Sequence, residues 1–436
     1  MQAHSGWFSM WPGGYEPWNW GTIYSTHFLV EAQAAGYPVP EDELALVLNY
    51  LRGVVATRRD TETMTQTLER AYGLYVLALA KKPDLALMDA LREEAMGKTE
   101  KNKTEKNKTE KKLMPVGLAE SFPTSAKAFL AVAYLVLGKK EPALALLGEK
   151  SPAVSEALDT GGVLRSPARE TAILLSAYLD LDPASPEVPA LVERLKRYRV
   201  ECRWGSTQEN AFALLALGKY ARKLASTPRE FSAEIRIGDA PPVCMAYGDR
   251  RAFSGKSLSG PARISLQGPG TLFYSWIVEG VPTDGPVEEV DAGIVVRRRY
   301  LGKRGEPLDP LAIPCGEPLV VELSLATDQY VANVVVTDLL PAGIEVENPD
   351  LSGAEARAAT VVKVKPGESD FIAPAYLSCR DDRAIFFFNL SPGKWRHRYA
   401  CRAVTRGDFQ LPPVQAEAMY NAALRSISGA GRIVVK

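Results

Sequence analysis

The stretch Ala126-Lys-Ala-Phe-Leu-Ala-Val-Ala-Tyr-Leu135 predicts the fold of the first half of the chain. As a helix it would be apolar nearly all round, and helices apolar on every side are buried among other helices. Its small alanines would let neighbouring helices approach closely. The same pattern recurs in three further segments, which are Ala71–Ala80, Thr171–Leu179 and Asn210–Leu217.

Amphipathic, more charged segments alternate with these four, which predicts an inner and an outer ring of helices. The spacing between the inner segments is roughly 40–55 residues and suits one helical hairpin per repeat. We therefore expect an α/α toroid. The expected helices are Ile23–Ala35, Glu41–Arg58, Thr63–Ala80, Leu85–Ala95, Ser125–Leu137, Glu141–Leu147, Arg169–Leu179, Val188–Arg199 and Ser206–Lys223. Thr22 is the expected N-cap of the first helix, and Gly36 its stop signal.

After about Arg229 alternating and β-branched runs take over, with Gly, Pro, Asp and Asn between them. This pattern is typical of antiparallel β-sandwiches. Helices first and strands afterwards indicate separate domains. The fold class is therefore an incomplete α/α toroid followed by antiparallel β-sandwich domains. The expected strands are 233–237, 262–266, 271–278, 294–300, 319–325, 332–338 and 384–389.

The tract Lys98–Lys112 interrupts the helical pattern with a repeated Lys-Thr-Glu-Lys-Asn unit. It contains no apolar residue and cannot bury surface, so we expect a solvated, mobile insert.

Four of the seven tryptophans lie in the first twenty residues, and they are Trp7, Trp11, Trp18 and Trp20. They form an aromatic loop that runs into a helix, and Trp204-Gly205-Ser206 repeats the pattern of Trp20-Gly21-Thr22. Only five residues precede Gly6, so we expect the helical array to begin in mid-domain. The rings either pack on helix starts, which is the interpretation we favour, or line a carbohydrate cleft. A glycosidase would need two opposed carboxyl groups, and Glu16 has no identifiable partner.

The charge balance offers no case for nucleic acid or an anionic membrane, since 52 basic and 52 acidic residues cancel. Five scattered cysteines without a C-x-x-C pair, and three histidines, predict no metal site and no cofactor. Cys379 and Cys401 lie on two strands that could form a hairpin, which makes them a candidate disulfide; separate buried thiols are the alternative.

Two other polar features favour structural roles. Adjacent strand residues point to opposite faces, so the carboxylates of Asp381 and Asp382 do not converge, and Arg380 and Arg383 beside them predict a salt-bridged turn. His27 on the first helix is more typical of a packed histidine than of a catalytic one.

Several stretches resemble the bacterial α2-macroglobulin family, in order over nearly the whole chain. In the first half they resemble its thioester-domain region, and in the second half its last macroglobulin-like domain. The stretches are Gly6–Gly14, Trp20–Thr22, His27–Ala32, Ala35–Pro40, Trp204–Asn210, Val335–Gly343, Arg380–Arg383, Arg402–Thr405, Gly407–Val414 and Ala416–Tyr420.

The resemblance implies a broad-spectrum peptidase inhibitor and no catalytic activity. In the family a protease cuts a bait region, the molecule rearranges, and an internal Cys–Gln thioester couples to the protease. The thioester lies in a C-x-E-Q motif N-terminal to the aromatic loop, and this sequence contains no such motif. Cys202, followed by Arg-Trp-Gly, is no substitute. The chain is then either a C-terminal fragment, which its start favours, or a member of a thioester-less branch.

The resemblance also implies three domains. Residues 1–225 would form a toroid lacking its first helices, residues 226–285 a small bridging β domain, and residues 286–436 a macroglobulin-like β-sandwich. A methionine near the family's C-terminus shields the thioester, and Met419, with Tyr420, matches it. The implied partners are target proteases and upstream macroglobulin-like domains, in a monomer. The implied location is the periplasm or cell envelope, with an anchor on a missing N-terminus. A toroid enzyme acting on carbohydrate and a non-inhibitory surface-binding module stay open as alternatives.

Overall fold

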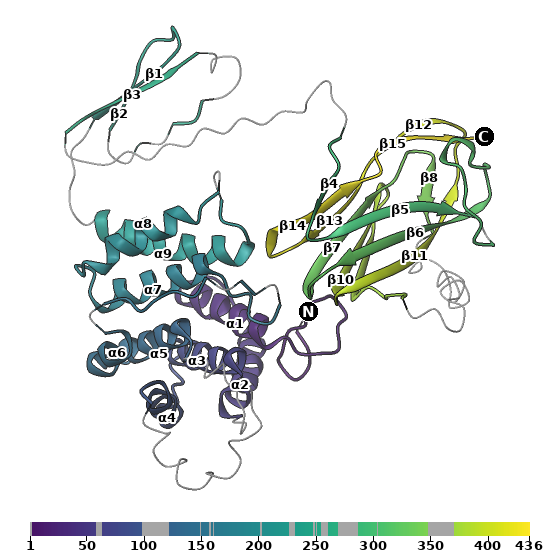
Figure 1. Ribbon diagram of the computed structural model, residues 1–436. Helices are drawn as coiled ribbons and strands as arrows, with labels where there is room; N and C mark the ends of the chain where they lie inside the picture. Colours follow the sequence, from purple (N-terminus) through teal and green to yellow (C-terminus); the bar gives the residue numbers. More distant parts are fainter. Residues whose placement is uncertain are drawn as a thin grey trace.

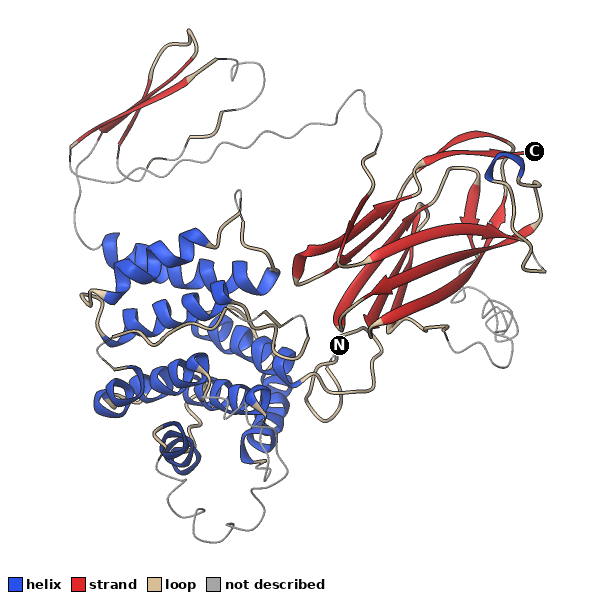
Figure 2. Cartoon of the chain, viewed as in Figure 1, coloured by secondary structure: helices blue, strands red, loops and turns tan. Residues whose placement is uncertain are grey.

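Helices occupy the first half of the chain and strands the second, as the computed structural model shows (Figures 1 and 2). The described residues are 2–57, 63–97, 122–148, 150–156, 158–159, 161–200, 203–225, 232–246, 249, 251–253, 260–268, 287–302, 304–347 and 370–436. The predicted insert Lys98–Lys112, the predicted strand 271–278 and Cys202 lie outside them. None of the described helices combines the length with the apolar composition that a membrane span requires.

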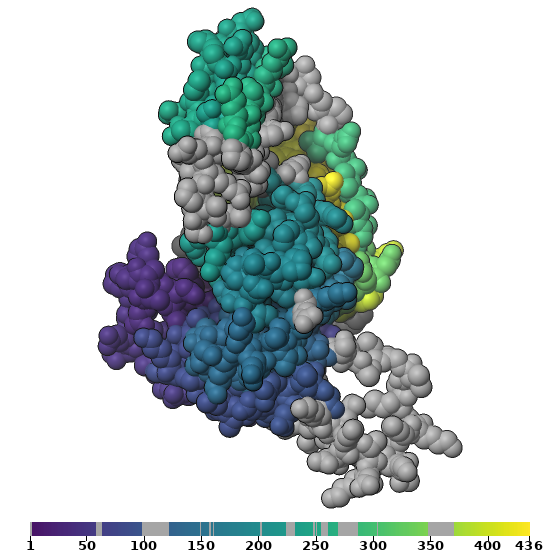
Figure 3. Space-filling view, turned by 90° about the vertical axis from the view of Figure 1, so that its left-hand side faces the viewer, coloured from purple at the N-terminus to yellow at the C-terminus, as the bar shows by residue number. Residues whose placement is uncertain are grey.

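The helices of the described part agree closely with the predicted segments. They are α1 (Asn19–Ala34), α2 (Glu41–Ala56), α3 (Met64–Leu79), α4 (Leu85–Ala95), α5 (Thr124–Val136), α6 (Lys140–Leu147), α7 (Pro167–Leu181), α8 (Glu187–Arg197) and α9 (Thr207–Ala225). Figure 3 views this helical array from the side turned away from the later strands.

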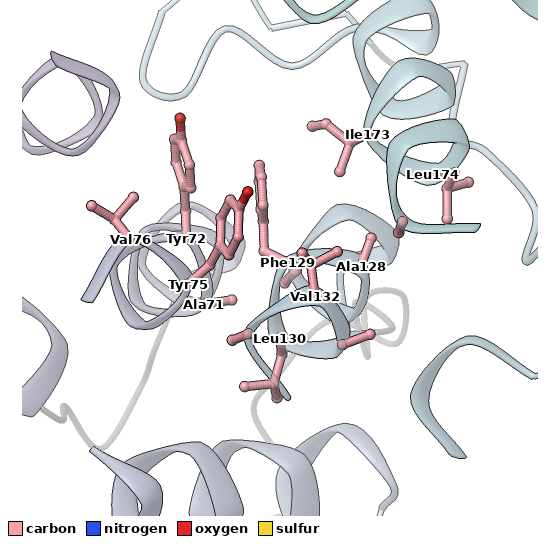
Figure 4. Packing of buried hydrophobic residues seen from close by; sticks show 14 of the residues in the cluster. Ala71, Tyr72, Tyr75, Val76, Ala128, Phe129, Leu130, Val132, Ile173 and Leu174 are labelled. Carbon is pink, nitrogen blue, oxygen red and sulfur yellow. The ribbon is translucent and has the colours of Figure 1, made fainter. Parts of the chain in front are cut away.

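The inner helices α1, α3, α5, α7 and α9 pack side by side in that order, with the even-numbered helices outside them. Aromatic rings from several inner helices meet along the axis. Tyr72 of α3 stacks on Phe129 of α5, with ring centroids 4.2 Å apart, and Phe212 of α9 lies 6.3 Å from Phe129. Figure 4 shows Tyr72, Tyr75 and Phe129 projecting into the space between the helices. The predicted all-round burial is therefore confirmed for the segments in α3, α5 and α7, whereas α9 leaves Leu214 and Leu215 exposed.

The start of α1 differs from the prediction. The helix begins at Asn19 with Trp18 as its N-cap, four residues before the predicted cap Thr22. The Thr22 hydroxyl bonds loop backbone instead, because it accepts from the Phe8 N–H at 2.9 Å and donates to the Trp18 carbonyl at 2.9 Å. Gly36 ends the helix as predicted, with a φ of +87° that favours glycine.

The described strands form four antiparallel sheets. A separate sheet of order β2-β1-β3 contains β1 (Ser232–Ile237), β2 (Val243–Ala246) and β3 (Ala262–Gln267). The other three have the orders β4-β14-β13-β7-β10-β9, β5-β6-β11-β8 and β12-β15. Their strands are β4 (Val290–Ala292), β5 (Val295–Leu301), β6 (Pro318–Thr327), β7 (Val331–Leu339), β8 (Ile344–Val346), β9 (Tyr376–Cys379), β10 (Arg383–Leu390), β11 (Gly393–Ala403), β12 (Gly407–Leu411), β13 (Val414–Ala418), β14 (Asn421–Ser428) and β15 (Gly431–Val435).

The sheets from β4 onward enclose one apolar core, and we call this part of the molecule the β-sandwich. Alternation along the strands builds the core, because β10 buries Ala384, Phe386 and Phe388 on one face. The β-sandwich also buries an ion pair, which Arg298 forms with the fully buried Asp338. The Tyr399 hydroxyl donates to the other carboxylate oxygen of Asp338 at 2.6 Å.

The predicted hairpin between the two cysteine-bearing strands is wrong. Cys379 lies on β9, which pairs with β10, whereas Cys401 lies on β11, which pairs with β6 and β8. The strands thus belong to different sheets of the β-sandwich, and Cys379 and Cys401 are not bonded to each other. Burial raises the pKa of the Cys401 thiol well above its ordinary value.

We expect Asp338→Ala to destabilise the β-sandwich by roughly 3–5 kcal/mol, because it leaves the buried Arg298 cation without its counter-charge. Urea unfolding measures the change. The control is Asp382→Ala, which removes the exposed ion-pair partner of Arg383 and should leave the unfolding midpoint almost unchanged. Equal midpoints for the two variants would contradict a structural role of the buried pair.

Acid should weaken the β-sandwich through His397. Burial against Phe386 and Phe388 lowers the pKa of His397 from 6.5 to about 4, so the folded state binds a proton more weakly than the unfolded state. This contribution to stability is present above pH 6.5 and is lost as the pH falls towards 4, by up to roughly 3 kcal/mol. In thermal unfolding, His397→Phe should therefore lose less stability than the wild type between pH 7.5 and 5. Parallel pH profiles would exclude this assignment.

Candidate functional site

Starts of inner helices lie at a common end of the helical array, since Trp20 of α1 bonds Gln208 of α9 and the Ser125 N–H of α5 donates to Glu170 of α7. The aromatic loop lies at this end, before α1. The backbone N–H of Trp18 donates to the Phe8 carbonyl at 3.0 Å and so joins the two ends of the aromatic loop. Further helix starts at this end carry reciprocal caps, with Thr63 and Gln66 at α3 and Ser206 and Glu209 at α9.

Two tryptophans lie within the helical core. Trp20 is fully buried, with the Arg169 guanidinium 4.5 Å above its ring, and its indole N–H donates to Gln208 at 3.4 Å. Trp204 is 7 % exposed and donates its indole N–H to the Leu195 carbonyl at 2.9 Å. Trp20 therefore joins the starts of α1 and α9, and Trp204 joins the last turn of α8 to the start of α9. Neither buried ring presents an open surface to a sugar.

Trp18 joins the aromatic loop to the segment before α7. Its indole N–H donates to the Gly162 carbonyl at 3.3 Å. Gly21 leaves room for the Trp18 ring, since a Cβ at position 21 would lie only 2.1 Å from a ring carbon. The Asp159 carboxylate fixes the backbone of the same segment, because it accepts hydrogen bonds from the Gly161 N–H at 3.0 Å and the Val163 N–H at 3.2 Å.

Trp11 reaches out of the helical array to the β-sandwich. Its ring stacks on Tyr376 of β9, with centroids 5.1 Å apart and planes 6° from parallel. It also contacts Phe387 of β10, at a centroid distance of 4.4 Å. In Figure 1 the aromatic loop lies between α1 and the ends of β7 and β10. The remaining tryptophan of the loop, Trp7, is partly buried.

Met419 and Tyr420 form the turn between β13 and β14, and both side chains are partly buried. The Met419 N–H donates to the Asn333 carbonyl at 3.0 Å. The neighbouring residue, Ala332 of β7, approaches the helical array: a Cβ at Gly161 would lie 3.1 Å from the Ala332 Cβ. Burial raises the pKa of the Tyr420 phenol. The β13–β14 turn thus lies on the part of the β-sandwich that faces the helical array (Figure 1).

A cavity of about 360 Å³ lies where α1, α2 and α3 meet. Its lining contains one carboxyl group, that of Glu69, and also Arg70, which forms an ion pair with Glu94. Burial raises the pKa of Glu69, and the Asn19 amide donates to it at 3.4 Å. Glycoside hydrolysis requires a pair of carboxyl groups, which the described lining of this cavity does not provide. Glu16 of the aromatic loop is exposed.

The other polar candidates occupy structural positions. Asp382 pairs with Arg383 in the exposed turn between β9 and β10, as the predicted salt-bridged turn requires. His27 is 7 % exposed, and its Nδ1 lies 2.9 Å from the Tyr72 hydroxyl oxygen. Among the described residues no group of His, Cys, Asp and Glu side chains could hold a metal ion.

Sequence reasoning missed the residues that receive Trp11. Phe387 is the middle member of Phe386-Phe387-Phe388, and alternation sends it to the face opposite its two buried neighbours. Three consecutive aromatics in a half-buried strand therefore signal a second contact surface. Gly161 carried no recognisable signal, because its role depends on Ala332, which is distant in sequence.

A family model and curated relatives identify similar proteins. Residues 293–422 match the model described as the bacterial alpha-2-macroglobulin MG10 domain. The alpha-2-macroglobulin of Xylella fastidiosa (strain Temecula1) is 29 % identical over 99 % of this chain and 26 % of its own length. That of Escherichia coli K12 is 25 % identical over 100 % of this chain and 25 % of its own length. The chain spans about a quarter of the length of these curated relatives.

Solved structures share the fold over the whole chain. The native alpha-2-macroglobulin of Escherichia coli, from domain MG7 to the C-terminus, aligns with a TM-score of 0.71 and 20 % identity, covering 66 % of that chain. Salmonella alpha-2-macroglobulin reacted with methylamine aligns with a TM-score of 0.73 and 22 % identity, covering 27 % of that chain. At these identities the structures establish the fold alone.

Proposed function

This chain belongs to the bacterial alpha-2-macroglobulin family, and on that premise we propose that it forms the C-terminal part of a broad-spectrum peptidase inhibitor that traps proteases after bait cleavage. The observation that carries the proposal is the relation to alpha-2-macroglobulins along 99–100 % of the chain. The order of the folded parts, helices and then antiparallel sheets, supports it. The role is one of binding and trapping, not of catalysis.

The proposed division is a toroid lacking its first helices in residues 1–225, a bridging β domain in 226–285 and a macroglobulin-like β-sandwich in 286–436. The two ends of the inner helix series support an incomplete toroid. Phe28 on α1 is 69 % exposed and Leu214 on α9 is 65 % exposed. Large apolar side chains on helices that are otherwise packed indicate a face that further helices would cover.

We place the reactive thioester outside these 436 residues, since they contain no C-x-E-Q motif. A thioester survives only where water is excluded, and an apolar lid would provide that exclusion. Met419 and Tyr420 are our candidates for the lid, because their turn lies on the part of the β-sandwich that faces the starts of the inner helices.

The proposed partners are target proteases, reached through the full-length protein, and upstream macroglobulin-like domains. We propose a monomer without a nucleic-acid partner, located in the periplasm or at the cell envelope. An enzyme acting on carbohydrate and a non-inhibitory surface-binding module are the alternatives. The single carboxyl group in the described cavity does not favour the enzyme.

The genomic sequence upstream of residue 1 tests the proposal first. A C-x-E-Q motif within about one helical hairpin, in the same reading frame, would support the thioester inhibitor. The corresponding full-length protein, cut by trypsin, should then retain the protease covalently and block cleavage of large but not small substrates. An upstream stop codon next to a promoter would contradict the fragment, and free trypsin after bait cleavage would contradict the trap.

In that full-length protein, Met419→Ala should open the lid and speed the reaction of the thioester with methylamine. Release of the free thiol, followed with a thiol reagent, measures the rate. The control is Met96→Ala, which removes an exposed methionine at the end of α4. Equal rates for the two variants would remove the shielding role from Met419, while trypsin trapping would still report on the inhibitor function.

A further inference from the structure

We propose that Trp11 is a latch that holds the helical array on the β-sandwich, and that Gly161 sets how closely the two surfaces meet. The contact joins residues that are more than three hundred positions apart, Trp11 with Tyr376 and Phe387. The inference goes beyond the proposed function and does not depend on it, because the latch can be measured in this chain without a thioester.

The β-sandwich side of the contact is a platform of two rings. Tyr376 and Phe387 are directly opposite partners on β9 and β10, so their side chains lie on the same face of the sheet. Their ring centroids are 5.8 Å apart. The platform sits beside the sheet edge, since β9 is the last strand of its sheet. Phe387 points away from the core that Phe386 and Phe388 fill, so the platform needs a partner from outside the β-sandwich.

On the side of the helical array, the loops that carry Trp11 and Gly161 are bonded to each other. Trp11 and Gly161 come from two separate loops, and the hydrogen bond from Trp18 to the Gly162 carbonyl joins them. Gly161 lies against Ala332 of β7, so the two loops contact the same sheet at two points. A Cβ at Gly161 would lie 3.1 Å from the Ala332 Cβ, so a larger residue there would press on β7.

The covalent connection between the two parts does not set their relative position. Helix α9 ends at Ala225 and β4 begins at Val290, and the separate sheet of β1, β2 and β3 lies within that connection. Parts of a chain joined by so long a connection move relative to each other unless a surface contact holds them. Among the described residues, the stacked Trp11 ring and the Gly161–Ala332 contact join the two parts.

The first experiment compares Trp11→Ala with Tyr15→Ala by small-angle X-ray scattering on the 436-residue chain. Tyr15 belongs to the same loop and is 95 % exposed, so its removal controls for the loss of an aromatic ring. Trp11→Ala should shift the radius of gyration upwards and add the scattering signature of two parts moving independently. Trp11→Phe, which keeps a ring on the platform, should return most of the shift. Tyr15→Ala should scatter like the wild type.

Circular dichroism establishes that each variant keeps its helices and its β-sandwich. Should Trp11→Ala lose helical signal, Tyr376→Ala replaces it, because it removes the platform from the other side and leaves the aromatic loop unchanged. Scattering of folded Trp11→Ala or Tyr376→Ala that superimposes on the wild type would overturn the latch.

The second experiment separates the close contact from the stacking. Gly161→Val should wedge the surfaces apart with Trp11 still present, since even its Cβ would lie 3.1 Å from the Ala332 Cβ. The double variant Gly161→Ala with Ala332→Gly moves one methyl group across the contact and should restore the wild-type radius of gyration. A wild-type radius for folded Gly161→Val, or an expanded one for the double variant, would show that Gly161 does not set the distance between the surfaces.

Discussion

The stacking of Arg169 over the Trp20 ring is the interaction on which the arrangement of the molecule depends. It joins the start of α7 to the start of α1 across the axis, and the indole N–H extends the connection to Gln208 on α9. Because α1 follows the aromatic loop directly, the position of Trp20 determines where Trp18 and Trp11 lie. Through Trp11, one buried cation–aromatic contact determines where the helical array can receive the β-sandwich.

Both the helical array and the β-sandwich contain a network of buried charged side chains. In the β-sandwich, Asp338 is satisfied by Arg298 and Tyr399, so the network specifies how the two sheets face each other. In the helical array, the Arg169 guanidinium lies beside Glu170 and bonds the Val163 carbonyl, while the Glu170 carboxylate accepts from the Ser125 N–H at 3.2 Å. Both networks hold elements that are far apart in sequence.

Much of the fold was predictable because burial leaves a periodic trace in the sequence. Segments such as Ala126–Leu135 are apolar on all sides, and the helices they predicted agree with α3, α5, α7 and α9 to within a few residues. The start of α1 was missed because its N-cap, Trp18, carries no cap signal, while Thr22 does and bonds loop backbone instead. The hairpin of Cys379 and Cys401 was wrong because alternation identifies strands and does not identify their partners.

The sequence by itself determined the fold class, the inner helices, the resemblance to one family and the absence of a C-x-E-Q motif, since each of these is written in local composition or in a contiguous motif. Only the tertiary structure decided that Trp11 rests on Tyr376 and Phe387, and that Gly161 meets Ala332. The physical reason is that stacking and close packing depend on the distance between surfaces. That distance is set by all the elements that lie between them in the chain, and no local pattern records it.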